Sequence, residues 1–220
     1  MPMLGFDLIA PHYCCSCGQI GSSLCDNCKY DIISDVSQQC MSCLKPVGRY
    51  GDVCKECHVN YAKGWYVGLH RGALKRLIED YKFHNVRQNG HILGDLLSDV
   101  LPEMPNDVVI TTIPTIPSHI RQRGYDHAAI LAKTVADSKD LRYKPLIVRK
   151  NHTTQRGANR QLRLRQAQIA FTCPGAVPRS VLVIDDVATT GASLNAAAAQ
   201  LKLAGAQQVW VATITREPLD

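Results

Sequence analysis

The chain has 220 residues, of which 45% are hydrophobic, and a formal net charge of +6. This length and composition predict one domain or two small ones with a real hydrophobic core. No apolar run approaches the roughly 20 residues of a membrane span, and the first fifteen residues lack the basic leader of a secretory signal. We therefore expect a soluble, cytoplasmic protein.

The positive charge is unevenly distributed along the chain. Residues 111–170 contain 12 Lys and Arg against 3 Asp, whereas residues 1–60 contain 4 Lys and Arg against 6 Asp and Glu. An excess of cations in the middle of the chain predicts an anionic ligand for that part of the protein. The phosphates of a small molecule and the phosphates of a nucleic acid are both candidates.

Cysteines dominate the N-terminal region, where nine of the ten lie before residue 58. Two Cys-x-x-Cys pairs complete a tetrahedral Cys₄ site, so four pairs predict two structural zinc sites. Sequential pairing would leave spacers of 7 and 10 residues, and interleaved pairing is also open. The predicted ligands are Cys14, Cys17, Cys25, Cys28, Cys40, Cys43, Cys54 and Cys57.

Three other interpretations of these cysteines carry less weight. A disulfide scaffold is uncommon in a reducing cytosol, and an iron–sulfur cluster fits four evenly spaced pairs less well than two zinc ions do. His12 and His58 flank the pairs and could replace a thiolate, while Cys15 and Cys173 are spare. Two zinc ions on eight thiolates would give the first 60 residues a charge of about −6. Such a region suits a structural staple or a protein-docking surface better than nucleic acid.

After the cysteines, the pattern alternates between strands and helices. The composition predicts strands at 65–70, 108–113, 146–150, 181–185 and 208–214, and helices at 74–83, 90–101, 125–138 and 192–205. Because the predicted strands are apolar on both faces, we expect a parallel α/β sheet flanked by helices. The predicted division is a double zinc ribbon at 1–62 and an α/β domain at 63–220.

The stretch VLVIDDVATTGAS at 181–193 combines an apolar strand, two acids and a turn into a helix. The backbone N–H groups and the dipole at the helix start favour a phosphate, and Gly191 permits its close approach. Asp185 and Asp186 can accept hydrogen bonds from neighbouring hydroxyls, as on a ribose. A sugar phosphate would satisfy both halves, with Thr189, Thr190, Gly191, Ala192 and Ser193 around the phosphate.

This stretch closely resembles the binding motif for 5-phosphoribosyl 1-pyrophosphate (PRPP) in type I phosphoribosyltransferases. In that family the two acids hold the ribose 2′ and 3′ hydroxyls, and the turn cradles the 5′-phosphate. The resemblance implies a type I phosphoribosyltransferase-like sheet, and it implies Mg²⁺ bound together with the PRPP.

Nearly the whole chain resembles the ComF family, through the cysteine ribbons, YKF at 81–83, residues 113–136, the Arg-rich segment 155–171 and the PRPP motif. That family typically shows Arg-Gly-Phe-Asn-Gln where this chain has Arg-Gly-Tyr-Asp-His at 123–127, so Asp126 and His127 receive no role. The resemblance implies a pyrophosphate loop after the strand at 108–113. Its candidate residues are Thr115, Ile116, Arg121 and Arg123, although Arg121 fits an exposed basic helix start equally well. Lys82 faces the same cavity or simply covers the sheet.

Four further arginines, Arg156, Arg160, Arg163 and Arg165, fall where type I phosphoribosyltransferases carry a loop that closes over the substrate. They equally fit a nucleic-acid contact strip. The leading hypothesis is a PRPP-binding, phosphoribosyltransferase-like protein that displaces pyrophosphate if it is catalytic; the sequence shows no general base. The alternative is a non-catalytic component of natural competence and DNA uptake that binds single-stranded DNA. A third possibility is an adaptor that docks a DNA-uptake protein partner.

Overall fold

The computed structural model describes residues 12–36, 38–149 and 171–218. Among these residues, no helix is long and apolar enough to cross a membrane. The elements in chain order are α1 (Asp26–Ser34), β1 (Lys63–Leu69), α2 (Gly72–Phe83), α3 (Asn89–Val100), β2 (Val109–Thr112), α4 (Pro117–Arg123), α5 (His127–Ser138), β3 (Arg142–Tyr143), β4 (Val148–Arg149), β5 (Phe171–Thr172), β6 (Ser180–Ala188), α7 (Ala192–Leu203) and β7 (Gln208–Arg216).

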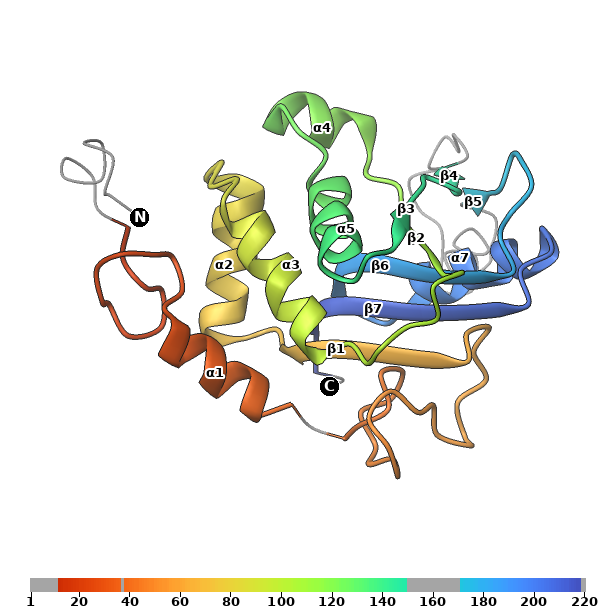
Figure 1. Cartoon of the computed structure of the whole chain (residues 1–220), viewed down its shortest axis with the longest axis horizontal. Helices are drawn as coiled ribbons and strands as arrows, with labels where there is room; N and C mark the ends of the chain where they lie inside the picture. The colour runs from red at the N-terminus through yellow and green to blue at the C-terminus, as the bar shows by residue number, and fades with distance from the viewer. Residues whose placement is uncertain (1–11, 37, 150–170, 219–220) are drawn as a thin grey trace, which may run out of the picture.

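The main sheet has five strands in the order β1-β7-β6-β2-β3, and every neighbouring pair is parallel (Figure 1). The residues Val181 to Ile184 of β6 are completely buried, as expected for a central strand covered on both faces. The predicted parallel α/β sheet with flanking helices is therefore confirmed.

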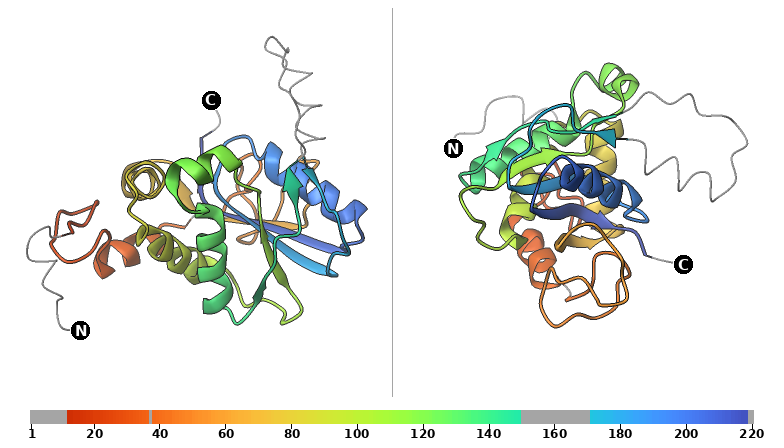
Figure 2. Two further views of the ribbon diagram at one scale, coloured as in Figure 1. Left: turned by 90° about the horizontal axis from the view of Figure 1, so that it is seen from above. Right: turned by 90° about the vertical axis from the view of Figure 1, so that its right-hand side faces the viewer.

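Helices cover both faces of this sheet. One face packs against α2, α3 and α5 through a core that includes Leu77, Leu97 and Leu131. The opposite face packs against α7 through a second core that includes Ala197 and Leu201. Figure 2 shows α7 on the far side of the sheet from the other three helices.

The helix expected at 125–138 is observed as α5, and the short helix α4, which was not predicted, precedes it. Pro117 occupies the first turn of the short helix α4, which ends where Gly124 adopts the left-handed conformation (φ 76°). Asp126 then caps α5 by accepting a hydrogen bond from the backbone N–H of Ala129 (3.3 Å). The glycine stop and the aspartate cap are sequence signals that the broader helical pattern obscured.

The strand expected at 146–150 also differs from its prediction. Of the described residues 146–149, Val148–Arg149 forms a strand, which pairs antiparallel with β5 in a separate two-stranded sheet. Leu146 and Ile147 are buried against the α7 side of the protein, so their apolar character reflects packing and not membership of the main sheet.

Candidate functional site

The eight predicted ligand cysteines form two compact groups. The first Cys₄ group contains Cys14, Cys17, Cys25 and Cys28, and the second contains Cys40, Cys43, Cys54 and Cys57. Within each group, the four sulfur atoms lie within 4.8 Å of one another. Sequential pairing of the Cys-x-x-Cys motifs is therefore observed, and the interleaved alternative is wrong.

Both groups have the geometry that zinc requires. A tetrahedron with Zn–S bonds of about 2.3 Å places its sulfur atoms about 3.8 Å apart. The Sγ atoms of Cys17 and Cys25 are 3.7 Å apart, and those of Cys43 and Cys54 are 3.4 Å apart. No histidine joins either group among the described residues, and all ten cysteines are free thiols. The groups are compatible with two structural zinc sites.

The strand connections diverge at the carboxyl ends of β2 and β6, and the space beyond these ends is called the crevice below. From β2 the chain passes through α5 toward β3, whereas from β6 it passes through α7, on the opposite face, toward β7. Parallel sheets bind ligands where adjacent strands diverge in this way. The last paired residues of the two strands are Thr112 and Ile184, so Asp185 lies immediately beyond this divergence.

The turn that follows β6 is open to solvent. Thr189, Thr190 and Ser193 are exposed, and Gly191 has φ 72° with no atom within 4 Å of the position of an added Cβ. The hydroxyl of Thr190 accepts a hydrogen bond from the Ala192 backbone N–H (3.3 Å). The first turn of α7 thus presents backbone donors and hydroxyls to an unfilled space, as an anion requires.

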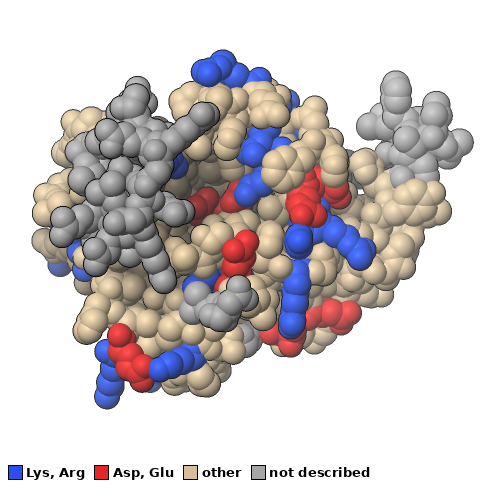
Figure 3. Space-filling model, turned by 180° about the vertical axis from the view of Figure 1, so that it is seen from behind, with Lys and Arg blue, Asp and Glu red and all other residues tan. Residues whose placement is uncertain are grey.

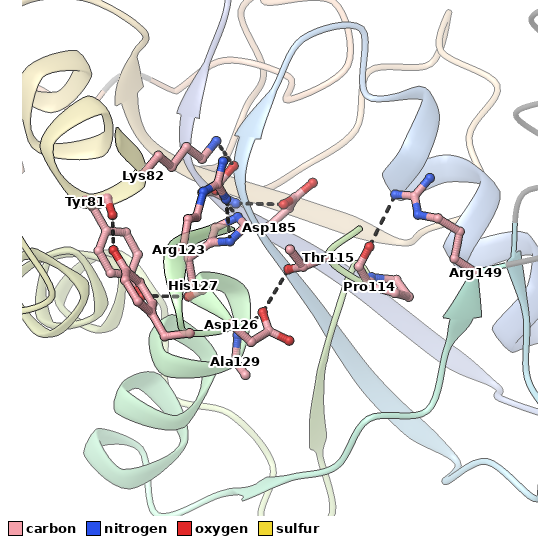
Figure 4. Close-up of polar contacts among 12 residues, drawn as sticks. Tyr81, Lys82, Pro114, Thr115, Arg123, Asp126, His127, Ala129, Arg149 and Asp185 are labelled. Atoms are coloured by element: carbon pink, nitrogen blue, oxygen red, sulfur yellow. Dashed lines mark hydrogen bonds and ion pairs between the residues drawn. The ribbon is translucent and has the colours of Figure 1, made fainter. Parts of the chain in front are cut away.

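Asp186, in contrast, is buried and contacts the side chains of Lys82 and His127. Its Oδ1 accepts from Lys82 Nζ (2.8 Å), and its Oδ2 lies 2.9 Å from His127 Nε2. Figure 4 shows that Lys82, Arg123 and His127 converge beside Asp185. A carboxylate has about four lone-pair positions, so Asp186 keeps acceptor capacity for a ligand hydroxyl.

The YKF motif at 81–83 and the segment 123–127 meet at the Asp186 carboxylate. The Tyr81 hydroxyl donates to the His127 carbonyl (2.8 Å), and the Tyr125 hydroxyl donates to the Tyr81 carbonyl. Their rings lie 5.5 Å apart. These contacts fix the end of α2 against the α4–α5 junction, which places Lys82 and His127 on the same acid.

The two adjacent aspartates have opposite pKa shifts. Burial, and then the charge of Asp186, raises the pKa of Asp185 above its ordinary value. Burial alone would also raise the pKa of Asp186, but the hydrogen bond from His127 and the charge of Lys82 outweigh it and lower that pKa. Asp186 is therefore the permanent anion of the pair, and Asp185 is the member that takes up a proton more readily.

The loop between β2 and α4 forms the other wall of the crevice. Thr115 lies in this loop, and its hydroxyl donates to Asp126 Oδ1 (2.8 Å), while Ile116 is exposed. Arg123 is partly buried and approaches His127 Nδ1 (2.9 Å), whereas Arg121 is exposed with its side chain in solvent. The structure thus brings Arg123, and not Arg121, next to the aspartates.

A cavity of about 230 Å³ opens beside Lys82 and Arg123, and it is also lined by Phe83, Tyr125, Asn85 and Gln122. The Arg123 guanidinium lies 5.6 Å from the centre of the Phe83 ring, which is largely exposed. Planar, polar and cationic groups therefore line this space, and one of them, Lys82, also contacts Asp186.

The sequence interpretation missed two residues of this edge. His127 received no role; Arg123 ends α4 and His127 begins α5, so the turn at Gly124 and not a shared helical face brings the two side chains together. Arg149 was also overlooked; it donates to the Pro114 carbonyl (3.3 Å) and its charge acts on Asp185. The predicted loop residues Arg156, Arg160, Arg163 and Arg165 lie outside the described residues.

Two curated proteins resemble the chain over most of its length. "Competence protein ComFC" of Streptococcus pneumoniae is 25% identical over 203 residues, which cover 89% of this chain and 88% of that protein. "Competence protein F" of Haemophilus influenzae is 27% identical over 210 residues, which cover 89% of this chain and 91% of that protein. No family model matches the sequence.

Solved structures with a partly similar arrangement include two phosphoribosyltransferases. A hypoxanthine phosphoribosyltransferase from Staphylococcus aureus aligns with a TM-score of 0.36 and 13% identity, covering 61% of this chain and 65% of that one. A purine phosphoribosyltransferase from Pyrococcus horikoshii aligns with a TM-score of 0.37 and 17% identity, covering 59% and 83%. This chain is therefore similar to these two competence proteins over about nine-tenths of its length, and it places two Cys₄ groups before a parallel α/β sheet.

Proposed function

We propose that this protein binds PRPP in the crevice between β2 and β6. The observation that carries the proposal is that Asp185 and Asp186 of β6 are followed directly by an exposed turn whose backbone N–H groups can bind an anion. Asp185 and Asp186 would accept hydrogen bonds from the ribose hydroxyls, and residues 189–193 would hold the 5′-phosphate. The two acids and the turn at 189–193 belong to one continuous chain segment, so they lie close enough to bind the ribose and the phosphate of the same molecule.

The β2–α4 loop and Arg123 would hold the pyrophosphate. Arg123 is the cation of α4 that faces the crevice, and a guanidinium can pair two phosphate oxygens at once. The edge offers carboxylate and hydroxyl oxygens, the donors that suit Mg²⁺. When bound to the ligand's own oxygens, Mg²⁺ would neutralise charge on the pyrophosphate leaving group.

If the protein is catalytic, its residues act by position and charge. Arg123 would stabilise the leaving pyrophosphate, and Asp186, the permanent anion, would face the ribose as positive charge develops on it. The acceptor would enter through the adjoining cavity lined by Phe83 and Gln122. Pyrophosphate release from PRPP, measured against a panel of bases and amines, tests for turnover.

Calorimetric titration of PRPP with and without Mg²⁺ tests the binding site itself. We expect the paired change Asp185→Asn and Asp186→Asn to weaken binding at least tenfold, because it replaces the two carboxyl groups that would accept hydrogen bonds from the ribose hydroxyls. Asp137→Asn, an exposed change on α5, is the matched control. Equal affinity in wild type and the paired variant would refute the ribose assignment.

The two similar proteins are named as competence proteins, which favours a second candidate function, a role in natural competence and DNA uptake. In this version, PRPP is a regulatory ligand and the Arg-rich segment contacts single-stranded DNA. Figure 3 shows basic and acidic side chains interleaved on the rear face of the described protein, so that face offers no continuous basic strip. The test is DNA binding across a salt series with Arg160→Ala and Arg163→Ala. An unchanged salt dependence would remove this segment from the DNA contact.

A further inference from the structure

His127 lies between the two charged halves of the candidate site. Its Nδ1 is 2.9 Å from Arg123 Nη1, and its Nε2 is 2.9 Å from Asp186 Oδ2. A guanidinium can only donate hydrogen bonds, so Nδ1 accepts and carries no proton. The single ring proton is then on Nε2, the ring nitrogen that lies 2.9 Å from Asp186 Oδ2. The contacts assign one tautomer of a neutral imidazole.

The surroundings of His127 hold the ring in this orientation. The residue is 8% exposed and begins α5, and its carbonyl accepts from the Tyr81 hydroxyl (2.8 Å). The Tyr81 ring packs edge-on against the imidazole, with the ring centres 6.2 Å apart. Rotation of the imidazole would break both ring contacts in a space that offers little room. His127 is therefore a fixed connector between Arg123 and Asp186.

We propose that His127 is a positioning residue that couples the pyrophosphate side of the crevice to its ribose side. Arg123 is the candidate pyrophosphate ligand and Asp186 the candidate ribose ligand, so the inference rests on the proposed PRPP site. A ligand that fixes Arg123 also fixes the imidazole, and the imidazole fixes the Asp186 carboxylate. Binding on one side then favours binding on the other, and the effect is reciprocal.

The chemistry of this connection predicts which substitutions preserve it. A glutamine can accept from Arg123 through its carbonyl oxygen and donate to Asp186 through its amide nitrogen. A leucine of similar size can do neither, and it leaves both Arg123 and Asp186 short of a partner. Lys82 remains on Asp186 in either case, so the carboxylate stays charged and the loss reports the connection to Arg123.

The test measures linkage between two fragments of PRPP. Pyrophosphate is titrated into the full chain, with Mg²⁺, in the absence and presence of saturating ribose 5-phosphate. In the wild type, we expect ribose 5-phosphate to tighten pyrophosphate binding about tenfold, a typical coupling between sites. We expect His127→Gln to retain this factor and His127→Leu to reduce it to near one. His119→Leu, an exposed change on α4, is the matched control.

A second measurement is independent of any ligand and of the stability of the leucine variant. Nitrogen-15 NMR of the unligated wild type, with the His127 signals assigned from His127→Gln, should place the proton on Nε2. A proton on Nδ1 would overturn the inference and leave the PRPP proposal intact. Equal coupling in wild type and His127→Leu would do the same. Failure of the wild type to bind PRPP or either fragment would overturn the proposed function, and the coupling with it.

Discussion

The two Cys₄ groups have the same ligands but different neighbours. The first group lies against the ends of α2 and α3: Arg76 Nη1 donates to the Cys15 carbonyl (2.8 Å), and Lys29 pairs with Asp99 (2.9 Å). These polar contacts are partly exposed and involve flexible side chains, while Cys14 and Cys28 of this group pack into the core on the α2–α3 face. The exposed side chains of Tyr13 and Ile20 face each other in a short antiparallel bridge of this group.

The second group is built into the α/β core. Met41, next to Cys40, is 1% exposed, and the completely buried Arg216 reaches it from the end of β7. The Arg216 guanidinium donates to four backbone carbonyls, those of Met41, Ser42, Ala188 and Glu217. Ala188 is the residue directly before the exposed turn at 189–193. One side chain thus joins the second group to the candidate phosphate site.

A second contact links the same two regions. Asn195, in the first turn of α7, accepts from the Asn60 backbone N–H (2.6 Å) and from the Asn60 side chain (3.0 Å). The second group therefore contacts both ends of the turn at 189–193, whereas the first group contacts neither within the described residues. The difference shows that identical metal-binding motifs can serve as a peripheral staple and as part of a site's support.

Loss of the metal from the second group should have a larger effect on the candidate site than loss of the metal from the first group. We expect Cys54→Ser with Cys57→Ser to lower the midpoint of thermal unfolding of the whole α/β domain, and to weaken PRPP binding at least tenfold. Structural zinc supplies free energy of folding directly, and here that energy also holds the support of the turn. The measurements are thermal unfolding by circular dichroism and calorimetric titration of PRPP.

The matched variant is Cys25→Ser with Cys28→Ser in the first group. We expect it to open the first group to limited proteolysis while PRPP affinity stays within about threefold of wild type. Equal losses of affinity in the two double variants would show that the groups do not differ in their connection to the site.

The next largest effect is expected for Arg216→Leu. This change leaves four buried or partly buried carbonyls without their donor, which should cost about 3–5 kcal/mol of unfolding free energy. Urea denaturation measures the cost, and Arg179→Leu, an exposed arginine on the approach to β6, provides the control. A loss below about 1 kcal/mol would mean that the four hydrogen bonds do not join the second group to the sheet.

The general fold could be predicted because its signals are local. Apolar runs such as Val181–Ile184 identify central strands, and the Cys-x-x-Cys spacing identifies metal groups. The pairing of the four motifs could not be predicted, because both spacers allow either arrangement. The buried role of Arg216 was equally hidden, since an arginine after an apolar strand usually marks the strand's exposed end.

In the candidate site, too, local motifs could be predicted from the sequence, whereas contacts between distant segments could not. The positions of Asp185 and of the open turn follow from one continuous motif. The pairing of Asp186 with Lys82 and His127 depends on helices that are distant in sequence, and only the packing of Tyr81 on Tyr125 brings them together. The functional roles of these residues, and the boundary between residues 62 and 63, stay predictions.

A smaller effect is expected for Asn195→Ala, which removes the acceptor for the Asn60 backbone N–H. The unpaired, partly buried donor should cost about 1–2 kcal/mol in urea denaturation, and PRPP binding should weaken severalfold because the first turn of α7 loses a support. Gln200→Ala, farther along α7, is the control. Asn195→Asp keeps the acceptor, so it should recover the stability; a loss as large as that of alanine would argue against this contact.

The smallest effect is expected where the first group meets α3. Lys29 and Asp99 form an ion pair 2.9 Å long, but their side chains are 32% and 44% exposed. Water and salt screen such pairs, so Lys29→Ala should change the unfolding free energy by at most about 0.5 kcal/mol. The change should vanish in 1 M salt, when compared in urea denaturation with the exposed control Lys202→Ala. A salt-independent loss comparable to that of Arg216→Leu would mean that the first group, too, is held by a strong polar contact, and the contrast between the two groups would fail.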